Sequence, residues 1–224
     1  MSRPEFDQYA ADYDRILKEA MPSGLGESDY FAEYKVKLLA RLLEGAEPRR
    51  VLDFGCGAGR SLPYLLQFFS KAECWGFDVS AESLKFAAQA APRARLSCDW
   101  GMVAQQQFDV IFAANVFHHI EPAERVGALE RCRRILAPDG KLFLFEHNPF
   151  NPLTRWVFER CPFDADAEMF SLERAREMSR QAGFLQEAHG YTLFFPKPLA
   201  WLRGLEPLLT RVPLGAQYYV QMAN

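Results

Sequence analysis

An acidic residue followed by three alternating glycines is the clearest chemical signal in the chain, with Asp53 preceding Gly55, Gly57 and Gly59. Glycine has no Cβ atom, so the backbone can turn sharply there and a ligand can approach the main chain closely. The residues before this stretch predict a strand and those after it a helix, so the turn also places a helix N-terminus beside the ligand. The pattern predicts a ligand-binding loop, although glycines can also serve a tight turn alone.

A second acid supports the ligand-binding interpretation. Asp78 ends the next predicted strand, about 20 residues beyond the glycines, where a carboxylate can accept hydrogen bonds from both ribose hydroxyls of a nucleoside cofactor. The dinucleotide pattern GxGxxG would require its third glycine at position 60, which is Arg60. A nicotinamide-dependent oxidoreductase is therefore an alternative that fits this spacing less well.

Three histidines follow predicted strands. His118 and His119 come after one strand and His147 after another, at the carboxyl edge of the sheet where ligands bind in open α/β folds. A histidine there can take a proton from an acceptor hydroxyl near neutral pH. The same residues can also serve as structural hydrogen-bonding groups, and the sequence leaves both roles open. His189 is predicted to lie in a loop.

The elements that must position these residues alternate along the first two thirds of the chain. Apolar runs predict strands at residues 51–55, 74–78, 94–98, 108–114 and 141–146, the last one after a turn at 138–140. Helical periodicity marks residues 30–43, 61–69, 81–91 and 122–136. This alternation predicts βαβ units and a mostly parallel sheet. In the last third we predict helices at 156–161, 171–182 and 199–209, and strands at 184–188, 191–195 and 217–222.

The stretch VLDFGCGAG, residues 51–59, resembles motif I (E/DxGxGxG) of the class I S-adenosylmethionine-dependent methyltransferases. Residues 108–120 are similar to the fourth strand and following loop of that family, and Pro138-Asp139-Gly140 to its conserved turn. The resemblance covers about residues 49–146, and the chain is similar to the small-molecule methyltransferases of ubiquinone and menaquinone biosynthesis. It implies a doubly wound α/β fold, with a mostly parallel, seven-stranded Rossmann-like sheet, an antiparallel last strand and helices on both faces.

The resemblance also implies roles for individual residues. Asp53 and the Gly55 carbonyl would receive the cofactor ammonium, and Asp78 the ribose. Asp99 would pair with the adenine amino group, while Trp100 and Val79 flank the ring. The predicted cofactor-binding set also contains Cys56, Gly57, Gly59, Asn115 and Tyr13, the last from an aromatic helix face that would cover the cofactor. S-adenosylmethionine carries no phosphate, so its site needs no basic cradle, and the sequence has none around the loop.

The expected activity is in-line transfer of a methyl group to a small acceptor. Aromatic residues are more frequent in residues 141–224 than in the rest of the chain, which suits an apolar, aromatic or lipid-linked acceptor. Packing of the C-terminal helices against the sheet explains the same residues equally well. Two alternatives stay open: an NAD(P)-dependent oxidoreductase of Rossmann type, and a non-catalytic subunit that binds S-adenosylmethionine.

Composition limits the remaining possibilities. The 224 residues carry a net charge of −3 and no basic block, which argues against nucleic-acid binding. We expect one methyltransferase domain, with an N-terminal helical cover at 1–48, a cofactor-binding core at 49–146 and an acceptor-side elaboration at 147–224. Five separated cysteines without metal-ligand spacing predict a reduced cytoplasmic protein with no metal site, and no apolar run is long enough to span a membrane.

Overall fold

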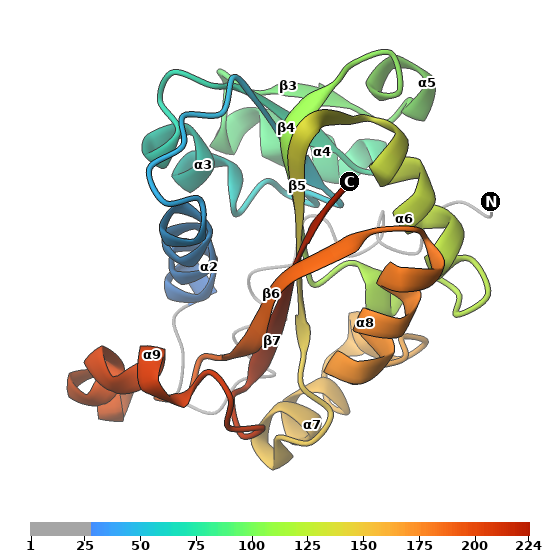
Figure 1. The fold of residues 1–224 in the computed structure, drawn as a ribbon. Coiled ribbons are helices and arrows are strands. Elements are labelled where there is room, and N and C mark those ends of the chain that lie inside the picture. Colours follow the sequence, from blue (N-terminus) through green and yellow to red (C-terminus); the bar gives the residue numbers. More distant parts are fainter. Residues whose placement is uncertain (1–27) are drawn as a thin grey trace.

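A seven-stranded sheet forms the centre of the computed structural model, which describes residues 28–224. The strand order is β3-β2-β1-β4-β5-β7-β6, and β7 runs antiparallel to both of its neighbours (Figure 1). The predicted sheet with an antiparallel last strand is confirmed. The strands are β1 (Arg50–Phe54), β2 (Glu73–Phe77), β3 (Arg95–Ser97), β4 (Phe108–Ala114), β5 (Leu136–His147), β6 (Leu185–Thr192) and β7 (Gln217–Ala223).

Helices cover both faces of this sheet (Figure 1). On one face α2, α3 and α4 bury apolar side chains such as Leu39, Leu65 and Ala87 against the strands. On the other face α6 and α8 do the same with Leu129 and Met178. Burial of the sheet on both faces explains why its parallel strands read as continuous apolar runs. These helices are α2 (Ser28–Leu42), α3 (Leu62–Phe68), α4 (Ala81–Ala90), α6 (Arg125–Arg134) and α8 (Leu172–Gln181).

Helix boundaries follow the expected capping chemistry. The Ser171 side chain accepts a hydrogen bond from the backbone of Arg174 at the start of α8, and Gly183 has φ +84° just beyond its end. Ser80 caps α4 in the same way through the backbone of Ser83. Among the described residues, no helix is both long and apolar enough to cross a membrane.

The turn predicted at residues 138–140 is instead a bulge inside β5. Leu136 pairs with Phe108, whereas Lys141 already pairs with Val110, so the extra residues of β5 loop out between two paired positions. Gly140 is required there because a Cβ atom would lie 2.8 Å from the carbonyl oxygen of Phe108.

Three predictions for the last third need correction. The helix expected at 156–161 is α7 (Pro152–Phe158), because the Asn151 side chain caps it and proline is accepted in the first turn. The two strands expected at 184–188 and 191–195 are the single strand β6, whose register shifts between Gln186 and Ala188, so His189 pairs with Val220 and is not in a loop. The helix expected at 199–209 is mostly the 3-10 helix η4 (Lys197–Leu205), followed by α9 (Glu206–Leu209).

Candidate functional site

A pocket of about 1570 Å³ lies where the loops after β1, β2, β4 and β5 meet α2. This is the carboxyl edge of the parallel strands, the usual ligand position in open α/β sheets. The pocket lining contains most of the residues predicted from sequence: Asp53, Gly55, Cys56, Gly57, Asp78, Val79, Trp100, Asn115, His118, His119 and His147. Gly59 and Asp99 are not among the lining residues, and Tyr13 lies outside the described residues.

The three glycines adopt left-handed backbone conformations, with φ of +74° at Gly55, +50° at Gly57 and +82° at Gly59. Their surroundings differ. A Cβ at Gly59 would come within 2.8 Å of the Ala87 backbone in α4, and one at Gly55 would overlap the Val116 side chain. A Cβ at Gly57 would meet no described atom within 4 Å. Gly59 therefore packs the loop onto a helix, whereas Gly57 keeps a surface of the pocket open.

Asp53 is buried beneath this loop, and its Oδ2 atom has no hydrogen-bond partner among the described residues. Burial, together with the nearby Asp78 carboxylate, raises the pKa of Asp53 to about 8, although Lys35 partly opposes the shift. A buried acceptor without a partner is unfavourable unless a ligand satisfies it. The resemblance to the methyltransferases predicts that the cofactor ammonium binds here, and an ammonium group would donate a hydrogen bond to this oxygen.

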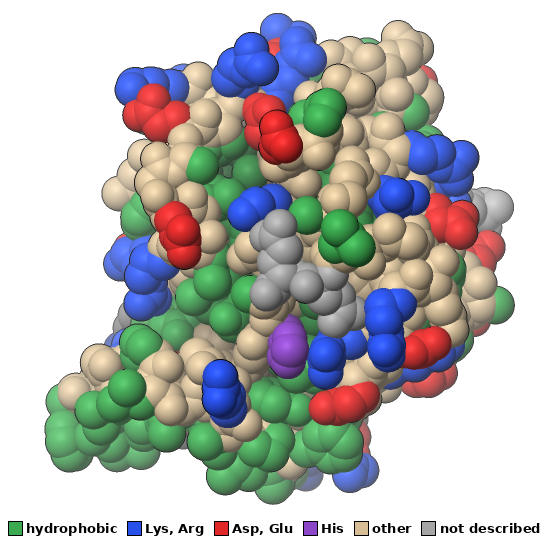
Figure 2. Space-filling model, viewed as in Figure 1, with side chains coloured by type: hydrophobic (Ala, Val, Ile, Leu, Met, Phe, Trp, Pro, Cys, Tyr) green, Lys and Arg blue, Asp and Glu red, His purple; other side chains and the backbone are tan. Residues whose placement is uncertain are grey.

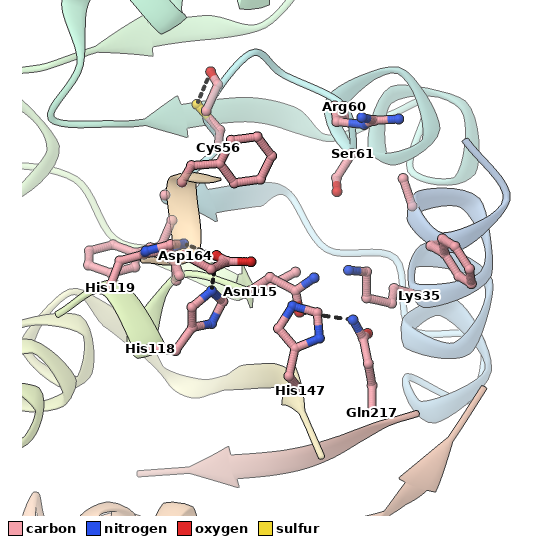
Figure 3. A pocket seen from close by; sticks show the side chains of 18 of the residues that line it. Lys35, Cys56, Arg60, Ser61, Asn115, His118, His119, His147, Asp164 and Gln217 are labelled. Carbon is pink, nitrogen blue, oxygen red and sulfur yellow. Dashed lines mark hydrogen bonds and ion pairs between the residues drawn. The ribbon is translucent and has the colours of Figure 1, made fainter. Parts of the chain in front are cut away.

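Lys35 is a pocket residue that the sequence reasoning missed. It projects from α2 toward Asn115 and His147 (Figure 3), is buried, and makes no hydrogen bond or ion pair with a described residue. Burial lowers the pKa of its ammonium to about 8. The sequence contains one indication of this role, because Lys35 lies on the same apolar face of α2 as Ala32, Val36 and Leu39. Lysine is almost never fully buried unless it is paired with another group.

Asp78 is held by the loop that it faces. Its Oδ2 accepts a hydrogen bond of 2.7 Å from the Gly57 amide, and its Oδ1 accepts one of 2.9 Å from the Ser80 amide. A carboxylate has about four acceptor positions, so capacity remains for ribose hydroxyls. Asp78 thus also fixes the loop conformation, a role that the sequence did not indicate.

Aromatic rings form one wall of the pocket beyond Asp78. The Trp100 ring lies edge-on to Phe77 and Phe54, with centroids 5.2 and 5.9 Å away, and Val79 is exposed beside them. Asp99 caps the short helix α5 (Trp100–Val103) by accepting a 2.7 Å hydrogen bond from the Gly101 amide. The predicted adenine contact of Asp99 would use the acceptor capacity that this cap leaves.

Cys56 and Asn115 reach the pocket in different ways. Cys56 is buried, and burial raises the pKa of its thiol well above the ordinary value, so it is not a reactive thiolate. Asn115 has φ +57° directly after β4, and its Oδ1 accepts a hydrogen bond from the Gln217 side chain of β7 (Figure 3). This bond joins the end of the parallel sheet to the antiparallel strand.

His118 and Glu146 form a buried pair at the ends of β4 and β5. His118 Nδ1 lies 2.6 Å from Glu146 Oε2, and the other carboxylate oxygen accepts hydrogen bonds from the amides of Val116 and Phe117. Burial disfavours a charged imidazole, but the carboxylates of Glu146 and Asp164 outweigh it and raise the pKa of His118 to about 9. Glu146 therefore fixes both the loop after β4 and the orientation of the His118 ring.

The other two histidines stay neutral. Burial lowers the pKa of His119 to about 3 and that of His147 to about 4, and the nearby positive charge of His118 adds to both shifts. His119 Nε2 lies 3.4 Å from Asp164 Oδ1. The His147 ring forms no hydrogen bond with any residue that the structure describes, and it faces the pocket (Figure 3).

Asp164 is the second pocket residue that the sequence did not indicate. It comes from the 3-10 helix η3 (Pro162–Asp164), and its Oδ1 lies 3.5 Å from His118 Nε2 (Figure 3). The chain beyond it is fastened to the histidine loop. The Glu168 amide donates to the His118 carbonyl, and the Arg125 guanidinium donates to the carbonyls of both Glu168 and Ile120.

Comparison with known proteins identifies the family of this site. Residues 52–144 match the model of a methyltransferase domain. The chain is 28% identical over 178 residues to trans-aconitate 2-methyltransferase of Rhodopseudomonas palustris, covering 77% of this chain and 62% of that protein. It is 35% identical over 112 residues to ubiquinone biosynthesis O-methyltransferase of Nitrobacter winogradskyi, covering 46% and 40%. The chain thus spans less than two thirds of the length of these relatives.

A solved structure shows that the likeness in fold extends over the whole chain. The cyclopropane synthase MmaA2 of Mycobacterium tuberculosis superposes with a TM-score of 0.67, at 19% identity, over 100% of this chain and 99% of that one. The matched family model begins in β1, before the glycine loop, and ends in β5. The region from β1 to β5 therefore belongs to the class I S-adenosylmethionine-dependent methyltransferases, and the chain has the fold of that class.

Proposed function

We propose that this protein transfers a methyl group from S-adenosylmethionine to a small, apolar or aromatic acceptor. The observation that carries the proposal is the buried Asp53, whose Oδ2 lacks a described partner beneath a loop that Gly57 keeps open. A cofactor with an ammonium group and no phosphate meets this demand. The sulfonium of that cofactor supplies an electrophilic methyl group, so the protein needs mainly to align the acceptor and exclude water.

Different residues of the pocket bind different parts of the cofactor. Asp53 and the Gly55 carbonyl face the ammonium, and the buried Lys35 offers a positive charge for the carboxylate of the same amino-acid tail. Asp78 accepts hydrogen bonds from the ribose, and Trp100 and Val79 flank the adenine. Charge matching at the tail and apolar contact at the ring would orient the cofactor along the edge of the sheet.

Aromatic side chains support an apolar acceptor. The pocket is also lined by aromatic rings from segments far apart in the sequence: Phe31, Phe158, Phe163, Phe194 and Phe195. Exposed apolar side chains of α7 continue this surface, with Leu153 in the pocket lining and Trp156 outside it, and Figure 2 shows hydrophobic surface gathered over this region. The two relatives, trans-aconitate 2-methyltransferase and ubiquinone biosynthesis O-methyltransferase, are named for small molecules and support a small acceptor.

His147 is the residue that we assign to the acceptor proton. Of the three histidines it alone lacks a hydrogen bond or ion pair with the described residues, so a ring nitrogen is available for an acceptor hydroxyl. A group that accepts this proton strengthens the nucleophile as the methyl group moves.

Calorimetric titration followed by turnover tests this function. Saturable binding of S-adenosylmethionine is expected, followed by release of S-adenosylhomocysteine with members of a panel of phenols, quinols and unsaturated acids. His147→Gln should keep cofactor affinity and lower kcat by about 100-fold or more. Absence of cofactor binding would overturn the proposal. Binding without turnover of any acceptor would favour the non-catalytic subunit.

A further inference from the structure

We infer that His118, His119 and Asp164 form a binding site for a divalent transition-metal ion, with zinc as the best fit. The three side chains meet on one wall of the pocket (Figure 3), and one ligand atom from each lies within 4.8 Å of the others. Two imidazoles and one carboxylate are the ligand set of many catalytic metal sites that keep a position open for substrate.

The two distances from the Asp164 carboxylate agree with a tetrahedral ion. Zinc bonds nitrogen and carboxylate oxygen at about 2.0–2.2 Å, which separates neighbouring tetrahedral ligand atoms by roughly 3.3–3.5 Å. Asp164 Oδ1 lies 3.5 Å from His118 Nε2 and 3.4 Å from His119 Nε2. The carboxylate therefore already stands at ligand spacing from both rings.

The surroundings of His118 match those of a metal ligand. Glu146 holds the Nδ1 side of the ring at 2.6 Å, which leaves Nε2 directed toward Asp164. A carboxylate on the far nitrogen of a ligating histidine fixes the ring and increases its basicity as a ligand. The side chains of His118, Glu146 and Asp164 are only 2%, 1% and 10% exposed, so the ring positions are set by packing.

Charge balance favours a divalent ion as well. Glu146 and Asp164 bring two carboxylates to this nearly buried region, and one doubly charged ion between neutral imidazoles would balance both. The competing explanation is an ion-pair network, in which a proton on His118 replaces the metal ion. Both explanations use the same contacts, so metal uptake distinguishes them.

The chain holds Asp164 in place independently of its own side chain. The Glu168 amide donates to the His118 carbonyl at 3.0 Å, and Arg125 donates to the Glu168 carbonyl at 2.9 Å. The ligand segment and the histidine loop are thus joined through the backbone. Replacing Asp164 by its amide should leave this framework intact.

An ion here would have a role in the proposed methyl transfer. All three ligands line the pocket, so the open coordination position would face the acceptor and could bind its oxygen as an anion. This role rests on the proposed function, whereas metal binding does not.

Metal titration tests the site directly. The full chain, freed of any affinity tag and stripped with EDTA, is titrated with Zn²⁺ by calorimetry and with Co²⁺ by visible absorption. One equivalent should bind, with the intense Co²⁺ bands of a tetrahedral site. Asp164→Asn and His119→Gln should each weaken Zn²⁺ binding by more than about 100-fold, because even changes outside the ligand set cost about 10–100-fold.

Matched controls exclude unspecific effects. Asp166→Asn removes another carboxylate that lines the pocket, and His189→Gln removes an exposed imidazole on β6; both should bind Zn²⁺ like the unmodified chain. Titration with S-adenosylmethionine reports whether each variant is folded and tests the proposed function separately. The proposed metal site would be wrong if the unmodified chain bound neither Zn²⁺ nor Co²⁺. It would also be wrong if the ligand variants bound these ions as well as the controls do.

Discussion

At the scale of single residues, the buried carboxyl of Asp53 restricts most strongly which chemical group of a cofactor can bind beside it. Its carboxyl is buried, has an oxygen without a described partner, and has a pKa raised to about 8. Near neutral pH without cofactor it is therefore largely protonated. An ammonium group beside it would favour the carboxylate, so cofactor binding and proton release are coupled at this residue.

Asp53→Asn is predicted to weaken cofactor binding while stabilising the cofactor-free protein. Loss of a charged hydrogen bond should reduce affinity by about 10–100-fold. Because the folded pKa exceeds the ordinary value of 3.8, burial of this acid costs stability increasingly as pH rises from about 4 to about 8. The variant should thus unfold at a higher temperature than the unmodified chain at pH 8, with little difference at pH 4.

Calorimetry and thermal unfolding at both pH values measure these effects. The affinity of the unmodified chain should increase as pH rises toward 8, and Asp53→Asn should lose the part of this pH dependence that comes from the carboxyl group. Unchanged affinity in Asp53→Asn would contradict the assignment of this residue to the cofactor ammonium.

At the scale of elements, the glycine loop combines two different requirements. Gly59 brings the loop against α4, whereas Gly57 leaves space at the pocket. Asp78, at the end of β2, accepts a hydrogen bond from the Gly57 amide and so links the loop after β1 to β2. The loop is therefore held by packing on one side and by a carboxylate on the other.

Gly57→Ala and Gly59→Ala are predicted to fail in different ways. Both substitutions strain a positive φ, which costs about 1–2 kcal/mol. Gly59→Ala adds a clash with the Ala87 backbone and should lower the free energy of unfolding further. Gly57→Ala should stay closer in stability and lose mainly cofactor affinity. Denaturant unfolding and calorimetry separate these results, and equal stability losses would contradict the assignment.

Arg125 joins the loop after β4 to the segment that precedes α8, at the carboxyl edge of the sheet. Its guanidinium donates to the carbonyls of Ile120 and Glu168 and lies 4.7 Å from the centre of the Phe170 ring. The Arg125 side chain is therefore bound in a fixed plane, and it keeps η3 next to the histidine loop.

Arg125→Lys is predicted to destabilise the protein by about 2–4 kcal/mol, because a lysine ammonium cannot reproduce the planar donor geometry and buried carbonyls lose their partners. Urea unfolding measures the loss. Arg131→Lys, a change on the same helix outside these contacts, should have an effect within about 0.5 kcal/mol. Similar losses in both variants would show that the hydrogen bonds of Arg125 do not carry the effect.

At the scale of the whole molecule, the pocket assembles aromatic residues from both ends of the described chain. Phe31 comes from α2 and Phe195 from the segment between β6 and η4, and both line the pocket. The C-terminal concentration of aromatic residues is thus only partly explained by packing of the added helices, since some of these rings face the pocket.

Phe31→Ala and Phe195→Ala are each predicted to raise KM for an apolar acceptor by about tenfold or more, since each removes a large apolar contact. The Kd for S-adenosylmethionine should stay within about twofold, because neither ring is among the residues assigned to the cofactor. Trp201→Ala is the matched control, as Trp201 is exposed and does not line the pocket. An unchanged KM in both pocket variants would place the acceptor elsewhere.

The sequence predicts most of the fold because its signals are local. The strand at 108–114 and the helix beginning after Ser171 have the predicted bounds or nearly so, since apolar runs and caps act between near neighbours. The long β6 and the bulge in β5 were not predicted, because glycine and proline there interrupt a strand that neighbouring strands keep paired.

By itself the sequence determined the glycine loop and the acid beyond it. Their geometry depends on backbone angles that glycine permits and on the order of strand, turn and helix within a short stretch. Only the tertiary structure decided that Asp164 meets His118 and His119, and that Lys35 enters the same pocket. Those contacts join residues far apart in the chain, and their positions depend on how whole elements pack against the sheet, which residue type and local spacing do not specify.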